Sequence, residues 1–282
     1  MAEAIHQTGR PLAVITGASS GIGAMFAKRL ARRGYDLVLV ARRKDRLDAL
    51  GEELRKAHGI HTESLQADLA REDDLRRVER RVEQAAELQF LINNAGFGTI
   101  PLFHKADVEG QDRMHRVHVM ATMRLTRAAL PTLIARNKGY VVNVSSVAAF
   151  IHGPGSVSYG STKAWMNHFT EGIHMELRLL GSRVRVQALC PGFTYTEFHD
   201  TLGLDRRFVS KGWWMPVEKV VDDSLAGLAR GKLYVIPGLR YKLIVLLLQA
   251  LPRAVVHAIA MRGPASRRKQ AEAGQRARDA SA

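Results

Sequence analysis

A glycine-rich segment near the amino end constrains the fold of this chain more than any other feature. Residues 16–23 read Thr-Gly-Ala-Ser-Ser-Gly-Ile-Gly and directly follow the apolar run 12–15. This pattern predicts a buried strand that leads through a tight loop into a helix. Such a loop exposes backbone N–H groups at a helix N-terminus, where the helix dipole favours a bound pyrophosphate. The spacing Gly-x-x-x-Gly-x-Gly differs from the commoner Gly-x-Gly-x-x-Gly. An ordinary strand–turn–helix is the alternative, but three glycines and two serines in one turn argue against it.

Apolar runs and amphipathic segments alternate along most of the chain. We predict strands over 12–16, 36–40, 62–67, 90–93, 140–144, 184–189 and 232–236. We predict helices over 21–33, 44–58, 71–86, 110–136, 158–180 and 217–230, with Pro131 as a kink or end of its helix. Strands separated by helices imply parallel pairing with right-handed crossovers. Short apolar strands fit a sheet covered on both faces. Residues 11–238 are therefore expected to form a single doubly wound α/β domain.

The segments outside this domain have a different character. Residues 1–10 are polar, lack the apolar stretch of a signal peptide, and are expected to be flexible. Residues 239–261 are expected to form an apolar helical extension, whose unbroken run 243–248 is far shorter than the roughly 20 residues that span a bilayer. A membrane-surface helix, a flap over the active site and a helix packed on the body or across an oligomer contact stay open, with packing favoured. Residues 262–282 are a basic tail expected to be disordered.

The bulk composition excludes several classes of protein. The net charge is +15, but no recognised nucleic-acid-binding module accompanies it, so we expect no nucleic-acid partner. Cys190 is the only cysteine, which excludes an intramolecular disulfide and fits a reducing compartment. We expect a cytoplasmic protein, with a weak membrane-surface contact through the extension left open. The histidines show no metal-ligand pattern, and no metal site is predicted.

The end of the second strand indicates which dinucleotide would bind. A carboxylate there would hydrogen-bond the ribose 2′-hydroxyl and repel a 2′-phosphate. This chain instead reads Val40-Ala41-Arg42-Arg43, with no carboxylate before Asp45. A guanidinium suits a phosphate because its paired N–H donors match the phosphate oxygens. The pattern favours NADP(H), and an ordinary surface arginine is the alternative.

Polar residues follow three further strands. Asp68 is placed to accept from the adenine amino group or, alternatively, to cap a helix. The stretch 93–96, Asn-Asn-Ala-Gly, leaves room for adenosine while its amides can link neighbouring strands. The turn 191–192, Pro-Gly, would bring the Thr196 hydroxyl to the nicotinamide amide. Residues 197–216 are rich in bulky apolar groups and predict either a lid over a substrate pocket or a surface helix with anchoring aromatics.

A tyrosine and a lysine carry the predicted chemistry. Tyr159 and Lys163 lie at i and i+4 and so face one side of a helix. A free tyrosine has a pKa near 10, and a nearby ammonium would lower the pKa toward neutrality. Lys163 would also reach the nicotinamide ribose. Ser146 ends the preceding strand and would hydrogen-bond the substrate oxygen as charge develops on it.

These residues, in this order and spacing, resemble the short-chain dehydrogenase/reductase family in its single-domain, NADP-dependent branch. The resemblance covers residues 11–238 and implies a Rossmann-type domain with a seven-stranded parallel sheet. It implies an oxidoreductase that moves hydride between nicotinamide and a carbonyl or secondary alcohol, with Tyr159 as acid/base. A homodimer or homotetramer that meets through its two long helices is also implied. The expected cofactor-binding residues are Gly17, Ser19, Ser20, Gly21, Ile22, Gly23, Arg42, Arg43, Asp68, Asn94, Tyr159, Lys163 and Thr196.

One position departs from the family pattern. Where the family has an asparagine that holds a water next to the lysine, this chain reads Val117-His118-Val119. His118 can donate or accept and so keep a proton relay with altered geometry, and we include it among the catalytic candidates. It could also mark a weakened enzyme, or be a hydrogen-bonded helix residue without a relay role, but the presence of Ser146, Tyr159 and Lys163 favours catalysis. The main hypothesis is an NADP(H)-dependent oxidoreductase acting on a hydrophobic small molecule, and the alternative is an NADPH-binding regulator with weakened catalysis.

Overall fold

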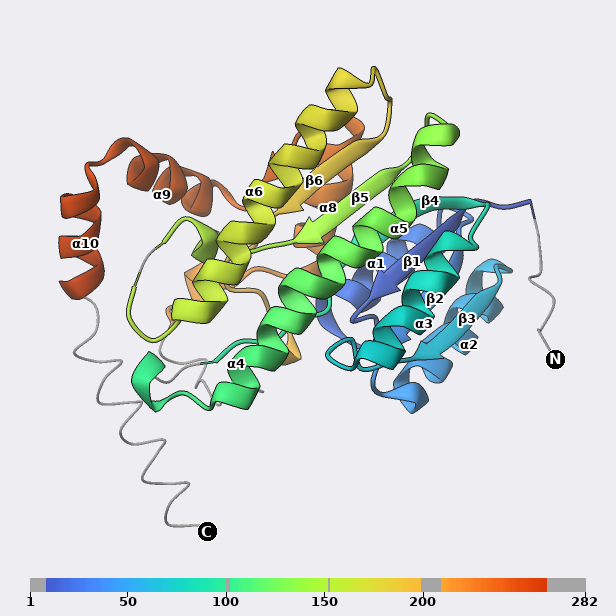
Figure 1. Ribbon diagram of the computed structural model, residues 1–282, viewed down its shortest axis with the longest axis horizontal. Helices are drawn as coiled ribbons and strands as arrows, with labels where there is room; N and C mark the ends of the chain where they lie inside the picture. The colour runs from blue at the N-terminus through green and yellow to red at the C-terminus, as the bar shows by residue number, and fades with distance from the viewer. Residues whose placement is uncertain (1–8, 100–101, 152, 199–208, 263–282) are drawn as a thin grey trace, which may run out of the picture.

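The strands of this chain form one parallel sheet. The computed structural model describes residues 9–99, 102–151, 153–198 and 209–262 (Figure 1). Its seven strands lie in the order β3-β2-β1-β4-β5-β6-β7. They are β1 (Leu12–Thr16), β2 (Asp36–Ala41), β3 (Thr62–Gln66), β4 (Leu88–Asn93), β5 (Tyr140–Val144), β6 (Arg185–Leu189) and β7 (Tyr234–Val235). This confirms the predicted doubly wound sheet. All carboxyl ends meet at one edge, where ligands bind in open sheets of this kind.

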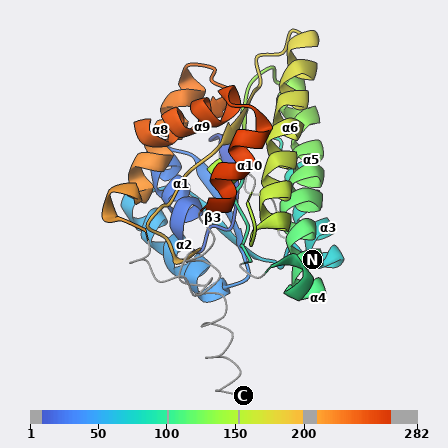
Figure 2. The same ribbon diagram turned by 90° about the vertical axis from the view of Figure 1, so that its left-hand side faces the viewer.

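Helices cover both faces of the sheet, as Figure 2 shows end-on. One face carries α1 (Gly21–Ala31), α2 (Lys44–His58) and α8 (Val217–Ala229), whereas the other carries α3 (Glu72–Glu83), α5 (Thr122–Ala135) and α6 (Val157–Leu179). Residues of β1 alternate between the two cores: Ala13 and Ile15 pack in one, and Leu12 and Val14 in the other. This alternation follows from the two-residue period of a strand, and both sets are apolar because both faces are covered.

The long helix predicted over 110–136 is more complex than expected. The structure has α4 (Val108–His115), then a π-helical turn η2 (Arg116–Ala121), then α5. π-helical turns occur frequently at functional sites, and this one carries His118. The prediction of Pro131 as a helix end was wrong, since α5 continues through it to Ala135. Pro131 is exposed, so water can satisfy the carbonyl that its missing N–H leaves free.

The two ends of the described chain differ from the expectation in detail. Arg10, within the segment predicted to be flexible, donates to the carbonyl of Gly59, and residues 1–8 lie outside the described residues. The apolar extension is helical as predicted but is split into α9 (Leu239–Ala250) and α10 (Arg253–Arg262). Pro252 follows the end of α9, consistent with the helix-breaking effect of proline. The tail 263–282 and residues 199–208 of the predicted apolar loop also lie outside the described residues. Within the described ranges, no helix is both long and apolar enough to cross a membrane.

Candidate functional site

The glycine loop is held in a shape that only glycines allow. Gly17 and Gly21 have φ values of +65° and +56°, in the left-handed region. A Cβ on Gly23 would lie 2.4 Å from the carbonyl oxygen of Gly17 and 2.5 Å from Nδ2 of Asn94. Asn94 Nδ2 donates to the carbonyls of Thr16 at 2.9 Å and Gly17 at 3.2 Å. Asn94 therefore ties the loop, which leads into the N-terminus of α1 at Gly21, to the end of β4.

The predicted link between neighbouring strands is confirmed by a chain of buried hydrogen bonds. Asn93 Nδ2 donates to Asn143 Oδ1 at 2.8 Å and to Thr126 Oγ1 at 3.0 Å. Asn143 Nδ2 in turn donates to Thr170 Oγ1 at 2.9 Å. These bonds join β4 and β5 to α5 and α6. They therefore hold the two strands and the helix α6, which carries Tyr159 and Lys163, in a fixed arrangement.

Arg43 connects three parts of the loop region. Its guanidinium donates to the hydroxyls of Ser19 and Ser20, each at 3.0 Å, and pairs with Glu197 at 2.9 Å. Arg46 also pairs with Glu197, and together the two cations hold the pKa of that carboxyl below its usual range. The predicted phosphate ligand Arg43 thus also brings the glycine loop and the segment after β6 together. The Ser19 and Ser20 hydroxyls retain their own protons to donate.

Arg42 and Arg43 differ in their surroundings. The Arg42 side chain is exposed and forms no hydrogen bond or ion pair with any residue in the described ranges. A cavity of about 370 Å³ lies beside the loop and is lined by Ser20, Gly21 and Thr196, among others. A Cβ on Gly21 would lie 3.0 Å from Cγ2 of Thr196, so the segment after β6 closes directly over the glycine loop. Three of the residues predicted to bind the cofactor, Ser20, Gly21 and Thr196, therefore line one space.

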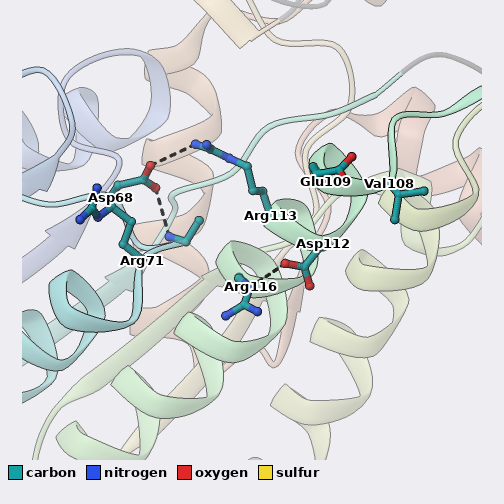
Figure 3. Close-up of a pocket in the computed structure, with 8 residues that line it drawn as sticks. Asp68, Arg71, Val108, Glu109, Asp112, Arg113 and Arg116 are labelled. Atoms are coloured by element: carbon teal, nitrogen blue, oxygen red, sulfur yellow. Dashed lines mark hydrogen bonds and ion pairs between the residues drawn. The ribbon is translucent and has the colours of Figure 1, made fainter.

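Asp68 faces a second cavity, of about 460 Å³, between the end of β3 and α4 (Figure 3). Its carboxylate accepts from the backbone N–H of Ala70 at 3.1 Å and pairs with Arg113 at 3.0 Å. The helix-cap alternative was wrong, because Arg71 occupies the N-cap of α3. Since each carboxylate oxygen can accept more than one hydrogen bond, Asp68 keeps the capacity to accept from an adenine amino group.

The predicted catalytic residues come together at the carboxyl end of β5. Ser146 follows that strand and begins the short helix η3 (Val147–Ala149), and Tyr159 lies in the first turn of α6. Lys163 is one turn further along α6. Its Nζ lies 5.7 Å from the centre of the Tyr159 ring and donates to the carbonyl of Val144 at 2.8 Å.

Burial shifts the pKa of both catalytic groups strongly. It raises the pKa of Tyr159 to about 12, although a side-chain hydrogen bond with Ser146 acts in the opposite direction. It lowers the pKa of Lys163 to about 7. The expectation that the lysine ammonium lowers the pKa of the tyrosine is not met in this structure. The reason is that desolvation disfavours the charged form of each group.

Replacing Lys163 by methionine should remove a pH-dependent cost of folding. The folded-state pKa of about 7 is below the ordinary 10.5, so the unfolded chain binds more protons between these values. The unfolding free energy of the wild type therefore rises with pH across this window, and burial of the charge costs most below pH 7. We expect Lys163→Met to have a higher melting temperature than the wild type, and the difference between the two should be largest near pH 6. The difference should shrink as pH rises. Lys138→Met, at an exposed lysine, is the matched control; a pH-independent difference for Lys163→Met would contradict the assignment.

His118 lies fully buried beside the catalytic tyrosine. Its Nδ1 is 2.9 Å from Thr162 Oγ1, and its Nε2 accepts from the backbone N–H of Phe97 at 3.2 Å. These partners assign the proton to Nδ1. Burial, with the nearby charges of Lys163 and His115, holds the pKa of His118 well below its usual range. Thr162 donates onward to the carbonyl of Tyr159 at 2.9 Å. The geometry favours the alternative of a neutral, hydrogen-bonded helix residue that positions the start of α6, because both ring nitrogens are in use.

Sequence reasoning missed Tyr241, which fixes the turn after β6 from the helix α9. Its ring packs on Gly192, where a Cβ would lie 2.1 Å from the ring. The Tyr241 hydroxyl accepts from the backbone N–H of Phe193 at 3.0 Å and donates to the carbonyl of Trp213 at 2.7 Å. The pairing of Gly192 with an aromatic residue outside the predicted domain could not be read from spacing. The predicted nicotinamide turn is therefore held in place by the carboxyl-terminal extension.

Tyr241→Phe should lower the unfolding free energy by about 1–3 kcal/mol, because it removes the hydrogen bonds of the Tyr241 hydroxyl with the Phe193 N–H and the Trp213 carbonyl. Chemical denaturation measures this loss. Tyr35→Phe is the matched control, since the described residues give the Tyr35 hydroxyl no hydrogen bond. Equal stability of the Tyr241→Phe variant and the wild type would show that the turn does not depend on this hydroxyl.

Comparison with known proteins agrees with this architecture. A family model described as short chain dehydrogenase matches residues 11–207. The chain is 32% identical over 189 residues to very-long-chain 3-oxoacyl-CoA reductase of Anas platyrhynchos, an alignment that covers 66% of this chain and 60% of that protein. The chain thus spans less than two thirds of that relative. It is 36% identical over 190 residues to sulfoacetaldehyde reductase 2 of Chromohalobacter salexigens, covering 66% of this chain and 74% of that protein.

Solved structures show the same fold over most of the chain. A short-chain dehydrogenase from Sphingobium yanoikuyae in complex with NADPH has a TM-score of 0.78 and 40% identity, covering 85% of this chain and 94% of that one. The bulky-bulky ketone specific alcohol dehydrogenase from Comamonas testosteroni has a TM-score of 0.74 and 36% identity, covering 86% and 94%. The predicted family is confirmed: the parallel sheet, the glycine loop and these matches show that the chain belongs to the short-chain dehydrogenase/reductase family of oxidoreductases.

Proposed function

We propose that this protein is an NADP(H)-dependent oxidoreductase that interconverts a carbonyl group and a secondary alcohol on a hydrophobic small molecule. The observation that carries the proposal is the grouping of Ser146, Tyr159 and Lys163 at the carboxyl end of β5, on the same sheet edge as the glycine loop. The regulatory alternative is not favoured, because all three side chains that the chemistry requires are present and close together.

The residues of the site fit a dinucleotide. The backbone at Gly17 and Gly23 packs too closely on Asn94 and on the loop itself to admit a Cβ. The N–H groups at the start of α1, where this loop ends, would bind the pyrophosphate. Ser19, Ser20, Ile22 and Thr196 would complete this cradle, Asp68 would receive the adenine, and Asn94 would hold the loop in shape. When bound, NADPH supplies the hydride.

The protein's own groups manage the proton and the developing charge. In reduction, the Tyr159 hydroxyl gives its proton to the carbonyl oxygen as hydride reaches the carbonyl carbon, so C=O becomes CH–OH. In oxidation, Tyr159 takes the hydroxyl proton back. Ser146 donates a hydrogen bond to the same oxygen, and Lys163, when protonated, favours the tyrosinate form. His118 acts through Thr162 on the position of Tyr159, and we assign it a positioning role.

Arg42 is the proposed contact to the 2′-phosphate. Because its guanidinium is exposed and has no partner in the described part of the chain, it can meet a phosphate without first breaking an ion pair. Arg42→Ala should raise the KM for NADPH by about 10- to 100-fold, the value of one or two hydrogen bonds to a charged group, and leave the KM for NADH unchanged. Arg32→Ala, an exposed arginine directly after α1, is the matched control. A parallel rise in both KM values would contradict the assignment.

Apolar groups around Tyr159 support a hydrophobic substrate. The Phe198 ring centre lies 5.8 Å from that of Tyr159. In the segment that precedes Tyr159 in the chain, Ile151 and Val157 expose 39% and 51% of their surface. Related proteins include one described as specific for bulky-bulky ketones and another described as a very-long-chain 3-oxoacyl-CoA reductase. Ketones with large apolar substituents are therefore the substrate class to test.

The direct test is the loss of NADPH absorbance when purified protein meets a panel of bulky apolar ketones and, as comparison, small hydrophilic ones. The proposal expects turnover with the bulky ketones and a strong preference for NADPH over NADH. Tight NADPH binding without turnover of any carbonyl would favour the regulatory alternative.

The proposal extends to assembly and location. We infer a homodimer or homotetramer in the cytoplasm that meets through the long helices α5 and α6. This is supported by Met123 and Met175, which expose 36% and 62% of their surface there. Sedimentation of the full chain tests the assembly. A weak contact of residues 239–261 with a membrane surface is the remaining part of the proposal.

A further inference from the structure

The helix α9 is apolar on two opposite sides, and among the described residues only one of these sides is buried. The inner side packs on the body through Tyr241 and Val245, which are 7% and 2% exposed. The outer side carries Leu239, Leu243, Leu246 and Leu247, which we call the outer stripe; their side chains are 71%, 50%, 64% and 61% exposed. The spacings i, i+4, i+7 and i+8 place all four on one face of the helix. A continuous leucine face of this kind marks an interaction site rather than scattered surface residues.

The charges around the outer stripe have a single sign. Arg240 and Lys242 flank the stripe on its two sides, since they lie roughly 75° and 85° from its centre on a helix of 3.6 residues per turn. Arg240 also donates from Nη1 to the carbonyl of Gly212 at 2.9 Å, whereas Lys242 is exposed. Residues 239–262 contain no aspartate or glutamate, and the chain beyond them is also rich in arginine. An apolar stripe bordered by cations is the pattern of a helix that lies in the headgroup region of an anionic bilayer.

Two other occupants fit these observations less well. The twelve residues of α9 extend about 18 Å, which is too short to cross the hydrocarbon core. A second copy of the chain, packed stripe to stripe, would bring Arg240 and Lys242 against the same cations with no carboxylate on either extension to balance them. Anionic lipid is the partner that satisfies both the leucines and the cations.

We propose that α9 docks this protein on the surface of an anionic membrane, with the outer stripe among the acyl chains and Arg240 and Lys242 at the headgroups. The inner side continues to hold the turn at Gly192, so docking leaves the site intact. Figure 1 shows α9 and α10 beyond the carboxyl end of β5, and Figure 2 views this side with α10 in front. The helix α9 therefore lies on the side of the molecule to which the carboxyl end of β5 points. This inference rests on the membrane contact proposed above, and it adds which face of α9 makes the contact and which class of lipid binds it.

Vesicle sedimentation of the full chain tests this docking without any turnover, so its outcome is separate from that of the enzymatic proposal. We expect binding to vesicles of phosphatidylcholine mixed with phosphatidylserine, weak binding to phosphatidylcholine alone, and release at high salt. The triple variant Leu243→Gln/Leu246→Gln/Leu247→Gln should lose at least about tenfold in partitioning, since three leucines no longer enter the acyl region. Lys242→Glu should weaken binding to the anionic vesicles only.

The matched control is Leu179→Gln/Leu180→Gln, which removes two exposed leucines at the end of α6 and should bind as the wild type does. Melting temperatures of all variants show whether each one is folded. Equal partitioning of wild type and triple variant, or no binding to anionic vesicles, would overturn the proposal. Sedimentation of the variants without vesicles gives the remaining outcome: an oligomer that dissociates only in the triple variant would make a second copy the occupant, and the lipid assignment would fail.

Discussion

Tyr159→Phe is expected to reduce turnover by about 1,000-fold or more while leaving the dissociation constant for NADPH unchanged. A positioned general acid contributes roughly 10²–10⁴-fold, and phenylalanine removes the only proton that Tyr159 can give. The ring itself remains, so its contacts with Phe198 and with His118 are retained. Ketone reduction measures the first quantity and NADPH fluorescence the second.

Tyr140→Phe is the control for this variant, because Tyr140 lies at the amino end of β5, the opposite end of the strand from Ser146. It should retain full activity. If Tyr159→Phe turned over as fast as the wild type, Tyr159 would not be the acid and the regulatory alternative would gain support. Loss of NADPH binding in the same variant would instead show that the hydroxyl holds the cofactor.

Gly23→Ala is expected to remove NADPH binding and to lower the unfolding free energy by about 1–3 kcal/mol, the usual cost of forcing an atom into a packed site. The added methyl would meet the Gly17 carbonyl at 2.4 Å and Asn94 at 2.5 Å. Neither neighbour can move freely, because Gly17 is backbone and Asn94 is bonded to two carbonyls of the loop. Relief of the clash must therefore open the loop that is proposed to receive the pyrophosphate.

Gly172→Ala provides the matched comparison within a helix. A Cβ there meets nothing within 4 Å, and alanine has the higher helix propensity, so we expect unchanged cofactor binding and equal or slightly greater stability. Calorimetry for stability and titration with NADPH for binding separate the two effects. Normal NADPH affinity in Gly23→Ala would contradict the role assigned to the loop.

The elements that the sequence predicted well are those with a strong local signal. The strand 12–16, the helix 44–58 and the strand 140–144 were predicted with the bounds that the structure has. Their apolar periodicity and their glycine or charged flanks are encoded within each segment. The helix around His118 was predicted as one regular element, whereas the structure has a π-helical turn there. The hydrogen-bond partners of His118 in this turn, Phe97 and Thr162, lie 21 and 44 residues away in the sequence.

The site shows the same division. The sequence alone determined the family, the doubly wound sheet and the grouping of Ser146, Tyr159 and Lys163, because these follow from short motifs and from the order of strands along the chain. Only the tertiary structure decided the protonation of these groups, since the pKa of Lys163 and Tyr159 depends on how completely other segments exclude water from them. It also decided that Tyr241 holds the turn at Gly192 and that one leucine face of α9 is exposed within the described part of the chain. Those outcomes depend on which side of a helix meets residues distant in the chain, and the helix is apolar on both sides.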